Sequence, residues 1–183
     1  MTTMAELSRL HLPWIFAVIL ALVAGLGDLR NRKIPNRLTV PALLLGILLN
    51  SLLGGWKGLL LSLEGAGLGL AILLPLVLLR GLGAGDWKLM GALGAMVGPK
   101  ETMDILLITV FMAAGWGVVE MVRQHRVKST LWNLWELVHG CVVFGLQPNP
   151  NISIDAPPLI KLPFGAVAAV ATAVALSAAW LGW

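Results

Sequence analysis

The sequence contains no tyrosine, a single cysteine and few charged residues, and these shortages exclude several classes of protein. One cysteine, Cys141, can form neither an intrachain disulfide nor a four-cysteine zinc site. Charged residues make up 12% of the 183 residues, about half the share that is usual in soluble domains. So few polar side chains cannot cover the surface of a water-soluble domain of this size. The shortages therefore exclude a disulfide scaffold, a disordered chain, a coiled coil and a soluble enzyme.

Long apolar runs take the place of the missing polar residues. Hydrophobic residues make up 58% of the chain, and the mean hydropathy is +0.87. A helix that crosses a hydrocarbon core about 30 Å thick needs roughly 20 apolar residues. The sequence therefore predicts an all-α, polytopic membrane bundle in one domain over 1–183. Its six expected transmembrane segments are 10–27, 38–53, 59–79, 83–99, 102–122 and 162–183.

The one long connection, 123–161, separates the last two predicted segments. Trp132 and Trp135 follow a helical spacing in its first half, which is typical of a helix lying in the membrane interface. Its second half, 147–158, is rich in proline and predicts an irregular loop.

Positive charges are distributed unequally between the two sides of the predicted bundle. Ten of the thirteen Lys and Arg residues fall on one side, namely Arg30, Arg32, Lys33, Arg37, Arg80, Lys88, Arg123, Arg126, Lys128 and Lys161. The other side holds Arg9, Lys57 and Lys100. Because cytoplasmic loops are enriched in Lys and Arg, we expect the basic side to be cytoplasmic and both termini to be extracytoplasmic.

Two aspartates, Asp28 and Asp86, are expected at the cytoplasmic ends of their segments and at similar depth. An ionisable residue at membrane level indicates a functional site. Each acid alone could instead pair with a nearby base, Asp28 with Arg30 or Arg32 and Asp86 with Lys88. The matched depth of the two acids favours a catalytic dyad over these separate ion pairs.

Two carboxyl groups in a confined site cannot both be ionised cheaply, so they are expected to share a proton. The ionised carboxylate can then accept a proton from water, while the protonated group polarises a peptide carbonyl. Gly83 and Gly85 lie just before Asp86. Without Cβ atoms, these glycines could let the backbone approach an extended substrate; alternatively, they could serve only close packing between helices.

At these positions the sequence resembles the type IV prepilin peptidase family, membrane aspartyl proteases marked by a GxGD motif. Three patches carry the resemblance: Asp-Leu-Arg-Asn-Arg-Lys-Ile-Pro-Asn at 28–36, Gly-Ala-Gly-Asp-Trp-Lys at 83–88 and Lys-Leu-Pro-Phe-Gly at 161–165. The resemblance implies that Asp28 and Asp86 are the catalytic pair. The further residues that it implies for substrate binding are Pro35, Asn36, Gly83, Gly85, Lys88, Pro163, Phe164 and Gly165.

The resemblance also implies a substrate class and a location. The substrates would be pilin-like membrane precursors whose short basic leader is removed at the cytoplasmic face of the inner membrane. No metal, organic cofactor or nucleic acid is implied. Larger family members carry an added region with paired CxxC motifs and methylate the new terminus with S-adenosylmethionine. Because this chain reaches its first aspartate at Asp28, we expect the short, peptidase-only form, as in Flp/Tad-type prepilin and preflagellin peptidases.

Three alternatives remain at the level of sequence. Presenilin-like proteases also use GxGD, but their first aspartate lies in a Tyr-Asp motif and a Pro-Ala-Leu motif follows GxGD. This sequence has no tyrosine, and its Pro-Ala-Leu at 41–43 comes before Asp86. A small ion- or proton-coupled transporter could use Asp28, Glu64 and Asp86 as ligands. A non-catalytic assembly protein could bind pilins without cutting them. The sequence leaves open whether the chain forms a homodimer.

Overall fold

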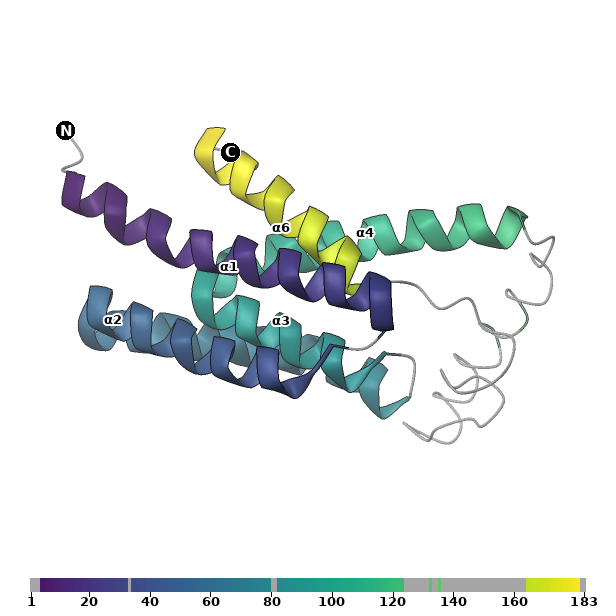
Figure 1. Cartoon of the computed structure of the whole chain (residues 1–183), viewed down its shortest axis with the longest axis horizontal. Coiled ribbons are helices and arrows are strands. Elements are labelled where there is room, and N and C mark those ends of the chain that lie inside the picture. Colours follow the sequence, from purple (N-terminus) through teal and green to yellow (C-terminus); the bar gives the residue numbers. More distant parts are fainter. Residues whose placement is uncertain are drawn as a thin grey trace.

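The computed structural model describes residues 4–32, 34–79, 82–123, 132, 135 and 164–181. All regular structure among these residues is helical (Figure 1), which confirms the predicted all-α class. The helices are α1 (Met4–Asn31), α2 (Asn36–Leu78), α3 (Ala84–Val97), α4 (Pro99–Arg123) and α6 (Phe164–Leu181). Trp132 and Trp135 are helical and exposed. The rest of the predicted interfacial helix, and most of the connection 123–161, lies outside the described residues.

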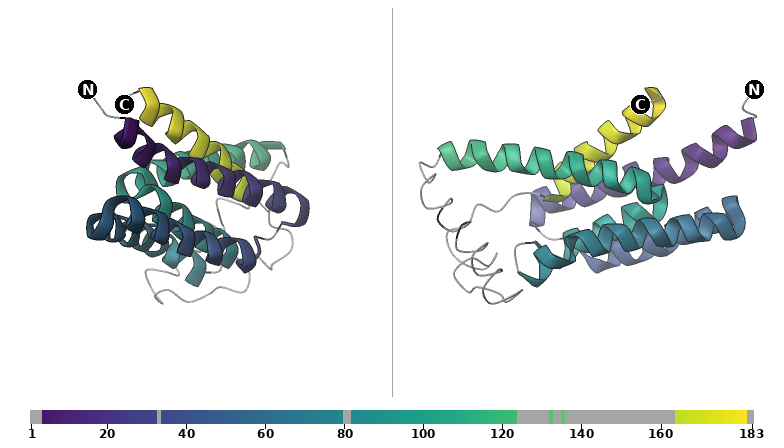
Figure 2. Two further views of the ribbon diagram at one scale, coloured as in Figure 1. Left: turned by 60° about the vertical axis from the view of Figure 1, so that its left-hand side comes forward. Right: turned by 180° about the vertical axis from the view of Figure 1, so that it is seen from behind.

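Helix α2 is a hairpin with its turn at Gly55. The backbone of Gly55 has φ 58° and ψ −139°, a non-helical conformation that glycine adopts easily. A Cβ on Gly58 would collide with the backbone oxygen of Asn50, although eight residues span about 12 Å along a straight helix. The chain therefore turns back on itself, and the two arms run side by side (Figures 1 and 2). The arms coincide with the predicted segments 38–53 and 59–79.

Helix α3 lies between the arms of α2 and forms the centre of the molecule. Every residue from Leu89 to Val97 is buried. A Cβ on Gly65 or on Gly94 would collide with the carbonyl oxygen of the other glycine, so the two helix backbones are in direct contact. At the same end, the side chains of Asn50 and Ser62 donate hydrogen bonds to the carbonyl oxygen of Ala95, at 2.8 and 2.6 Å. The two arms of α2 therefore hold α3 by backbone contact and by hydrogen bonds.

Helices α1 and α6 form the second closely packed pair. Their contact uses small buried residues, namely Ala17, Ala21 and Ala24 from α1 and Ala168 and Ala171 from α6. A Cβ on Gly25 would lie 3.1 Å from the backbone oxygen of Gly165. Small side chains let membrane helices approach closely, which increases the van der Waals contact between them. Helix α4 packs against α6 and α2.

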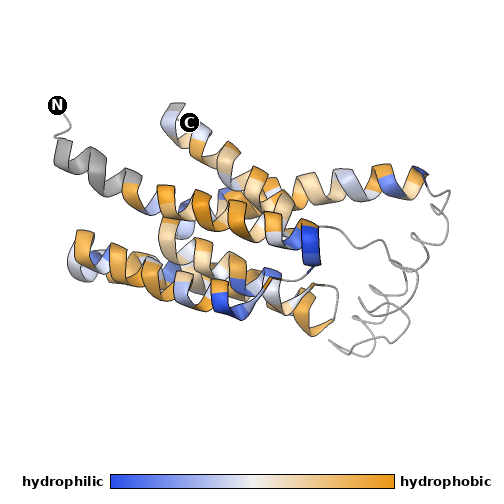
Figure 3. Ribbon diagram, in the orientation of Figure 1, coloured by the Kyte–Doolittle hydropathy of each residue, from blue (hydrophilic) through white to orange (hydrophobic). Residues whose placement is uncertain are grey.

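Large apolar side chains cover the outer surface of the bundle. Leu52 and Phe111 are each 74% exposed and Trp180 is 68% exposed, and hydrophobic residues extend along the helices in Figure 3. An apolar surface of this extent is unfavourable in water. Three of the described helices, α1, α2 and α4, are long and apolar enough to cross a membrane, and α6 is a shorter apolar helix. The protein is therefore a multi-pass membrane protein, and the count of six spans stays a prediction.

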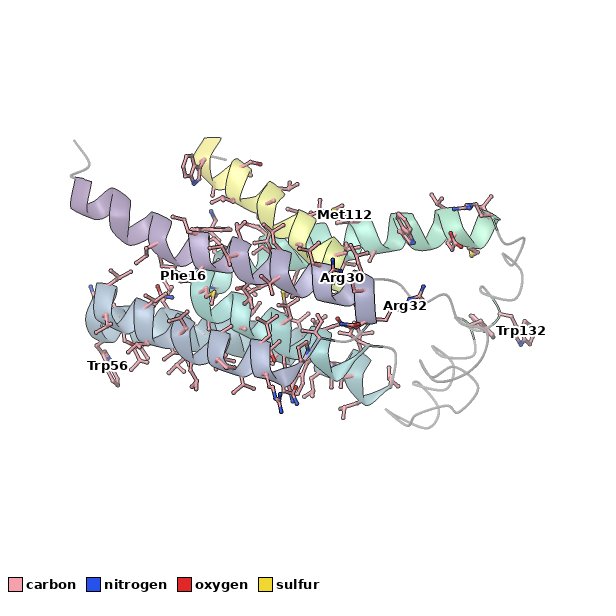
Figure 4. The ribbon with its side chains drawn as sticks, viewed as in Figure 1. Phe16, Arg30, Arg32, Trp56, Met112 and Trp132 are labelled. Atoms are coloured by element: carbon pink, nitrogen blue, oxygen red, sulfur yellow. The ribbon has the colours of Figure 1, made fainter. Side chains whose placement is uncertain are left out.

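One end of the bundle carries a cluster of bases, and we call it the basic end. It contains the end of α1, the beginnings of α2, α3 and α6, and the end of α4 (Figure 1). Figure 4 shows Arg30 and Arg32 there and Trp56 at the opposite end. Helix α1 extends beyond its predicted end at residue 27, to Asn31. Arg30 can remain in its last turn because a positive charge is stabilised at a helix C-terminus.

Candidate active site

Asp28 lies in the last turn of α1 and is buried, with 6% of its surface exposed. Its Oδ2 accepts a hydrogen bond from the backbone N–H of Gly165, at 2.9 Å. Gly165 is the second residue of α6, and the first backbone N–H groups of a helix have no acceptor within that helix. The Asp28 carboxylate therefore caps α6, although it belongs to a different helix.

Gly165 makes this contact possible because it has no side chain. A Cβ at this position would lie 3.0 Å from the Cβ of Asp28 and 3.0 Å from the Cδ1 of Ile34. The preceding residue, Phe164, is 8% exposed and belongs to the hydrophobic core. Phe164 thus holds the start of α6 in the core. Gly165, the next residue, leaves space for the Asp28 carboxylate.

Asp86 lies in the first turn of α3 and is partly exposed. The residue before this helix, Gly83, has φ −69° and ψ 141°, an extended conformation open to any residue. A Cβ on Gly83, however, would lie 2.9 Å from the Oδ2 of Asp86. Glycine at this position therefore provides space for the carboxyl group. Asp86 and Asp28 are near enough for the charge of Asp28 to act on Asp86, so the two residues that the sequence predicted to be catalytic are neighbours at the basic end.

Ile34 connects the two halves of this site, and the sequence did not identify it as a site residue. A Cβ on Gly85 would lie 2.8 Å from the backbone oxygen of Ile34 and 3.1 Å from its Cβ. Its Cδ1 lies beside Gly165, as described above, and the residue is 8% exposed. The missing side chain of Gly85 therefore allows the first turn of α3 to pack closely against Ile34. The sequence signal for this role was one apolar residue, Ile34, directly after the polar residues Arg-Asn-Arg-Lys at 30–33.

Lys88 bonds to Asn36 rather than to Asp86. Its Nζ donates a hydrogen bond to the Oδ1 of Asn36 at 3.0 Å, which joins α3 to the start of α2. Within the described part of the chain, Lys88 forms no ion pair with Asp86. Pro35 is exposed and forms the N-cap of α2. Pro163 lies outside the residues that the structure describes.

Glu64 does not join the site. It is exposed on the second arm of α2 and lies 14 residues before Leu78, where this arm ends at the basic end. Fourteen helical residues correspond to about 21 Å. Among the described residues, no group of three His, Cys, Asp or Glu side chains could hold a metal ion.

The arrangement supplies the groups that a general acid–base reaction with water requires. Asp28 and Asp86 come from different helices and lie at the same end of the bundle. An ionised carboxylate can accept a proton from water, and a protonated carboxyl group can donate one to a carbonyl oxygen. Neither Lys88 nor Glu64 competes for this pairing. Hydrolysis of an amide is thus within the chemical capacity of the site.

Comparison with known proteins gives a match to one family. The model of the type IV leader peptidase family matches residues 15–118, which include both aspartates. The curated relatives are named prepilin leader peptidase/N-methyltransferase. The protein from Aeromonas hydrophila is 34% identical over 145 residues, covering 74% of this chain and 48% of the relative. The protein from Escherichia coli K12 is 32% identical over 133 residues, covering 67% of this chain and 55% of the relative.

A third relative, from Xanthomonas campestris pv. campestris, is 30% identical over 127 residues, covering 63% of this chain and 42% of the relative. The chain thus spans about half the length of the curated relatives that it matches. No solved structure matches the chain significantly.

Proposed function

Because the chain belongs to the type IV leader peptidase family, we propose that it is an aspartic endopeptidase that removes the leader of prepilin-like membrane proteins. The observation that carries this proposal is that Asp28 of α1 and Asp86 of α3 lie at the same end of the bundle, near enough for the charge of one to act on the other. The relatives that share this region are named as prepilin leader peptidases. The proposed substrates are therefore precursors with a short leader before a hydrophobic helix.

The position of the aspartates supports a cut at the cytoplasmic boundary of the inner membrane. Both acids lie at the basic end of the bundle, and bases accumulate on cytoplasmic loops. Both termini would then lie on the opposite side. The scissile bond would approach from the basic end, where Pro35 and Asn36 begin α2 and Lys88 follows Asp86 on α3. We propose that these residues, together with Gly83 and Gly85, contact the substrate.

The proposed reaction is a direct attack of water on the peptide carbonyl. One carboxylate accepts a proton from the water molecule while the oxygen of that water bonds to the carbonyl carbon. The other carboxyl group donates its proton to the carbonyl oxygen, which forms a neutral tetrahedral intermediate. The carbon–nitrogen bond then breaks as the nitrogen takes up the proton from the first carboxyl group. The second carboxyl group recovers its proton from the intermediate, so the pair returns to its starting state.

The test replaces each aspartate by its isosteric amide. Asp28→Asn and Asp86→Asn are each expected to abolish cleavage of a precursor reconstituted with the purified protein in liposomes, because an amide cannot exchange a proton in this way. Glu64→Gln is the matched control, since it removes a carboxylate far from the site, and it should keep most activity. Either aspartate variant cleaving at the wild-type rate would contradict the proposed function. Complete loss of cleavage in the Glu64 variant would contradict the assignment of the site.

A further inference from the structure

The two aspartates have different electrostatic surroundings, and this difference carries an inference that rests on the proposed function. Asp28 accepts a hydrogen bond from the backbone amide of Gly165, and the amide of Ala166 and the positive charge of Arg32 also favour its ionised form. The amide of Gly83 favours the ionised form of Asp86, whereas the repulsion between the two carboxylates disfavours charge on both groups equally. Burial disfavours charge on both groups. The neighbouring backbone amides and Arg32 favour the negative charge on Asp28 more than the single amide of Gly83 favours it on Asp86.

The geometry of the Asp28 contact strengthens this asymmetry. Its Oδ2 accepts the Gly165 N–H at 2.9 Å, in a buried position. A backbone N–H can only donate, and it bonds more strongly to an ionised oxygen than to a neutral one. The start of α6 also carries a partial positive charge, which favours an anion there. Both effects are greatest in a position that water cannot reach.

The other charged groups around Asp28 do not reverse the asymmetry. Over its described length α6 has no ionisable side chain. From α3 come Asp86 and Lys88, and Lys88 is directed to Asn36. At the start of α2, Arg37 is exposed. Within the described part of the chain, no cation thus forms an ion pair with Asp86.

We propose that the two aspartates have fixed and different roles. Asp28 is the ionised member, which accepts the proton of the attacking water. Asp86 is the protonated member, which donates to the carbonyl oxygen of the scissile bond. Gly165 acts as a positioning residue, because its N–H holds the negative charge on Asp28 and fixes the direction of its carboxylate. When the carbon–nitrogen bond breaks, Asp28 gives its proton to the new amine and Asp86 recovers its own.

The pH dependence of cleavage distinguishes the two roles. A pair that works with one shared proton gives a bell-shaped profile. Its acidic limb reports protonation of the base, and its alkaline limb reports loss of the proton from the acid. A substitution that removes a hydrogen-bond donor from Asp28 therefore moves only the limb that belongs to Asp28. If Asp28 is the base, that limb is the acidic one.

Gly165→Pro and Gly165→Ala provide the matched comparison. Both add atoms beside Asp28, but only proline removes the N–H, and the first turn of a helix tolerates proline. In Gly165→Pro the acidic limb of kcat/KM should move to higher pH by about one unit, the size expected for a hydrogen bond to a charged group. In Gly165→Ala both limbs should keep their positions, although the rate falls. Movement of the alkaline limb in the proline variant would show reversed roles and overturn the proposal.

A second pair of variants decides the question if Gly165→Pro does not fold. Arg32 is exposed and its charge acts on Asp28. Arg32→Gln should move the acidic limb upward by a few tenths of a unit at low salt, and Arg32→Lys should leave it in place. Unmoved limbs in Arg32→Gln would overturn the assigned roles while leaving the peptidase function intact. A wild-type chain that cleaves no precursor would instead contradict the proposed function, and the division of roles with it.

Discussion

Adding one methyl group at Gly85 tests whether the contact between Ile34 and α3 sets the geometry of the dyad. In Gly85→Ala the new Cβ would lie 2.8 Å from the backbone oxygen of Ile34, whereas ordinary contacts begin at 3.4 Å. Either Ile34 or the first turn of α3 must therefore move by about 0.6 Å. Because Asp86 is the next residue, part of this displacement reaches its carboxyl group. A misplacement of about 1 Å can reduce a rate about 100-fold, so we expect cleavage to slow about tenfold.

The stability of the same variant should change much less than its rate. Overpacking costs about 1–3 kcal/mol, but alanine favours a helix over glycine by up to about 1 kcal/mol. The free energy of unfolding should therefore fall by no more than about 2 kcal/mol. Gly67→Ala is the control, because a Cβ on Gly67 meets nothing within 4 Å.

The assay compares single-turnover cleavage of a precursor in liposomes with thermal unfolding of the same preparations. Wild-type cleavage by Gly85→Ala would refute the packing argument. A raised KM with an unchanged kcat would show instead that the methyl group disturbs the substrate contact proposed for Gly85 and leaves the carboxyl groups in place.

Three further predictions concern the supports of the site. Asn50→Leu should lower the free energy of unfolding by about 1–3 kcal/mol, measured by chemical denaturation, because the buried carbonyl of Met96 loses its side-chain donor and that of Ala95 keeps only Ser62; its kcat should stay near wild type. Trp87→Phe removes the indole N–H that donates to the carbonyl oxygen of Leu70 at 2.6 Å. It should cost about 1 kcal/mol and slow cleavage, since Trp87 adjoins Asp86. Chelators such as EDTA should leave the cleavage rate unchanged, and restoration of lost activity by added metal would contradict the proposed dyad.

The helices could be predicted from the sequence because the membrane imposes strong rules on composition. Apolar runs of fixed length and the alternation of basic loops were enough to find α1, both arms of α2, α3, α4 and α6. The same alternation predicted that Asp28 and Asp86 lie at one end of the bundle. The end of α1 was predicted four residues too early, because a drop in hydropathy does not by itself end a helix.

The contacts inside the site could not be predicted, because they depend on how distant segments pack. Gly165 and Asp28 are separated by 137 positions in the chain, and neither hydropathy nor charge pattern indicates their hydrogen bond. The sequence offered Asp86 as a possible ion-pair partner for Lys88, and the structure shows Asn36 instead. The role of Ile34 between two glycines is equally a consequence of tertiary packing.

The two aspartates of the proposed dyad belong to two groups of helices that have separate supports. Asp86 belongs to α3, which Asn50 and Ser62 fix between the arms of α2, whereas Asp28 belongs to α1 and caps α6. Helices α1 and α3 also touch directly, and Ile34 adds contacts with both sides of the site, so the alignment of the two carboxyl groups depends in part on Ile34. Changes at this junction should alter the cleavage rate more than the stability, and changes at Asn50 should do the opposite. Because the two effects have different structural origins, they can be measured independently in the same chain.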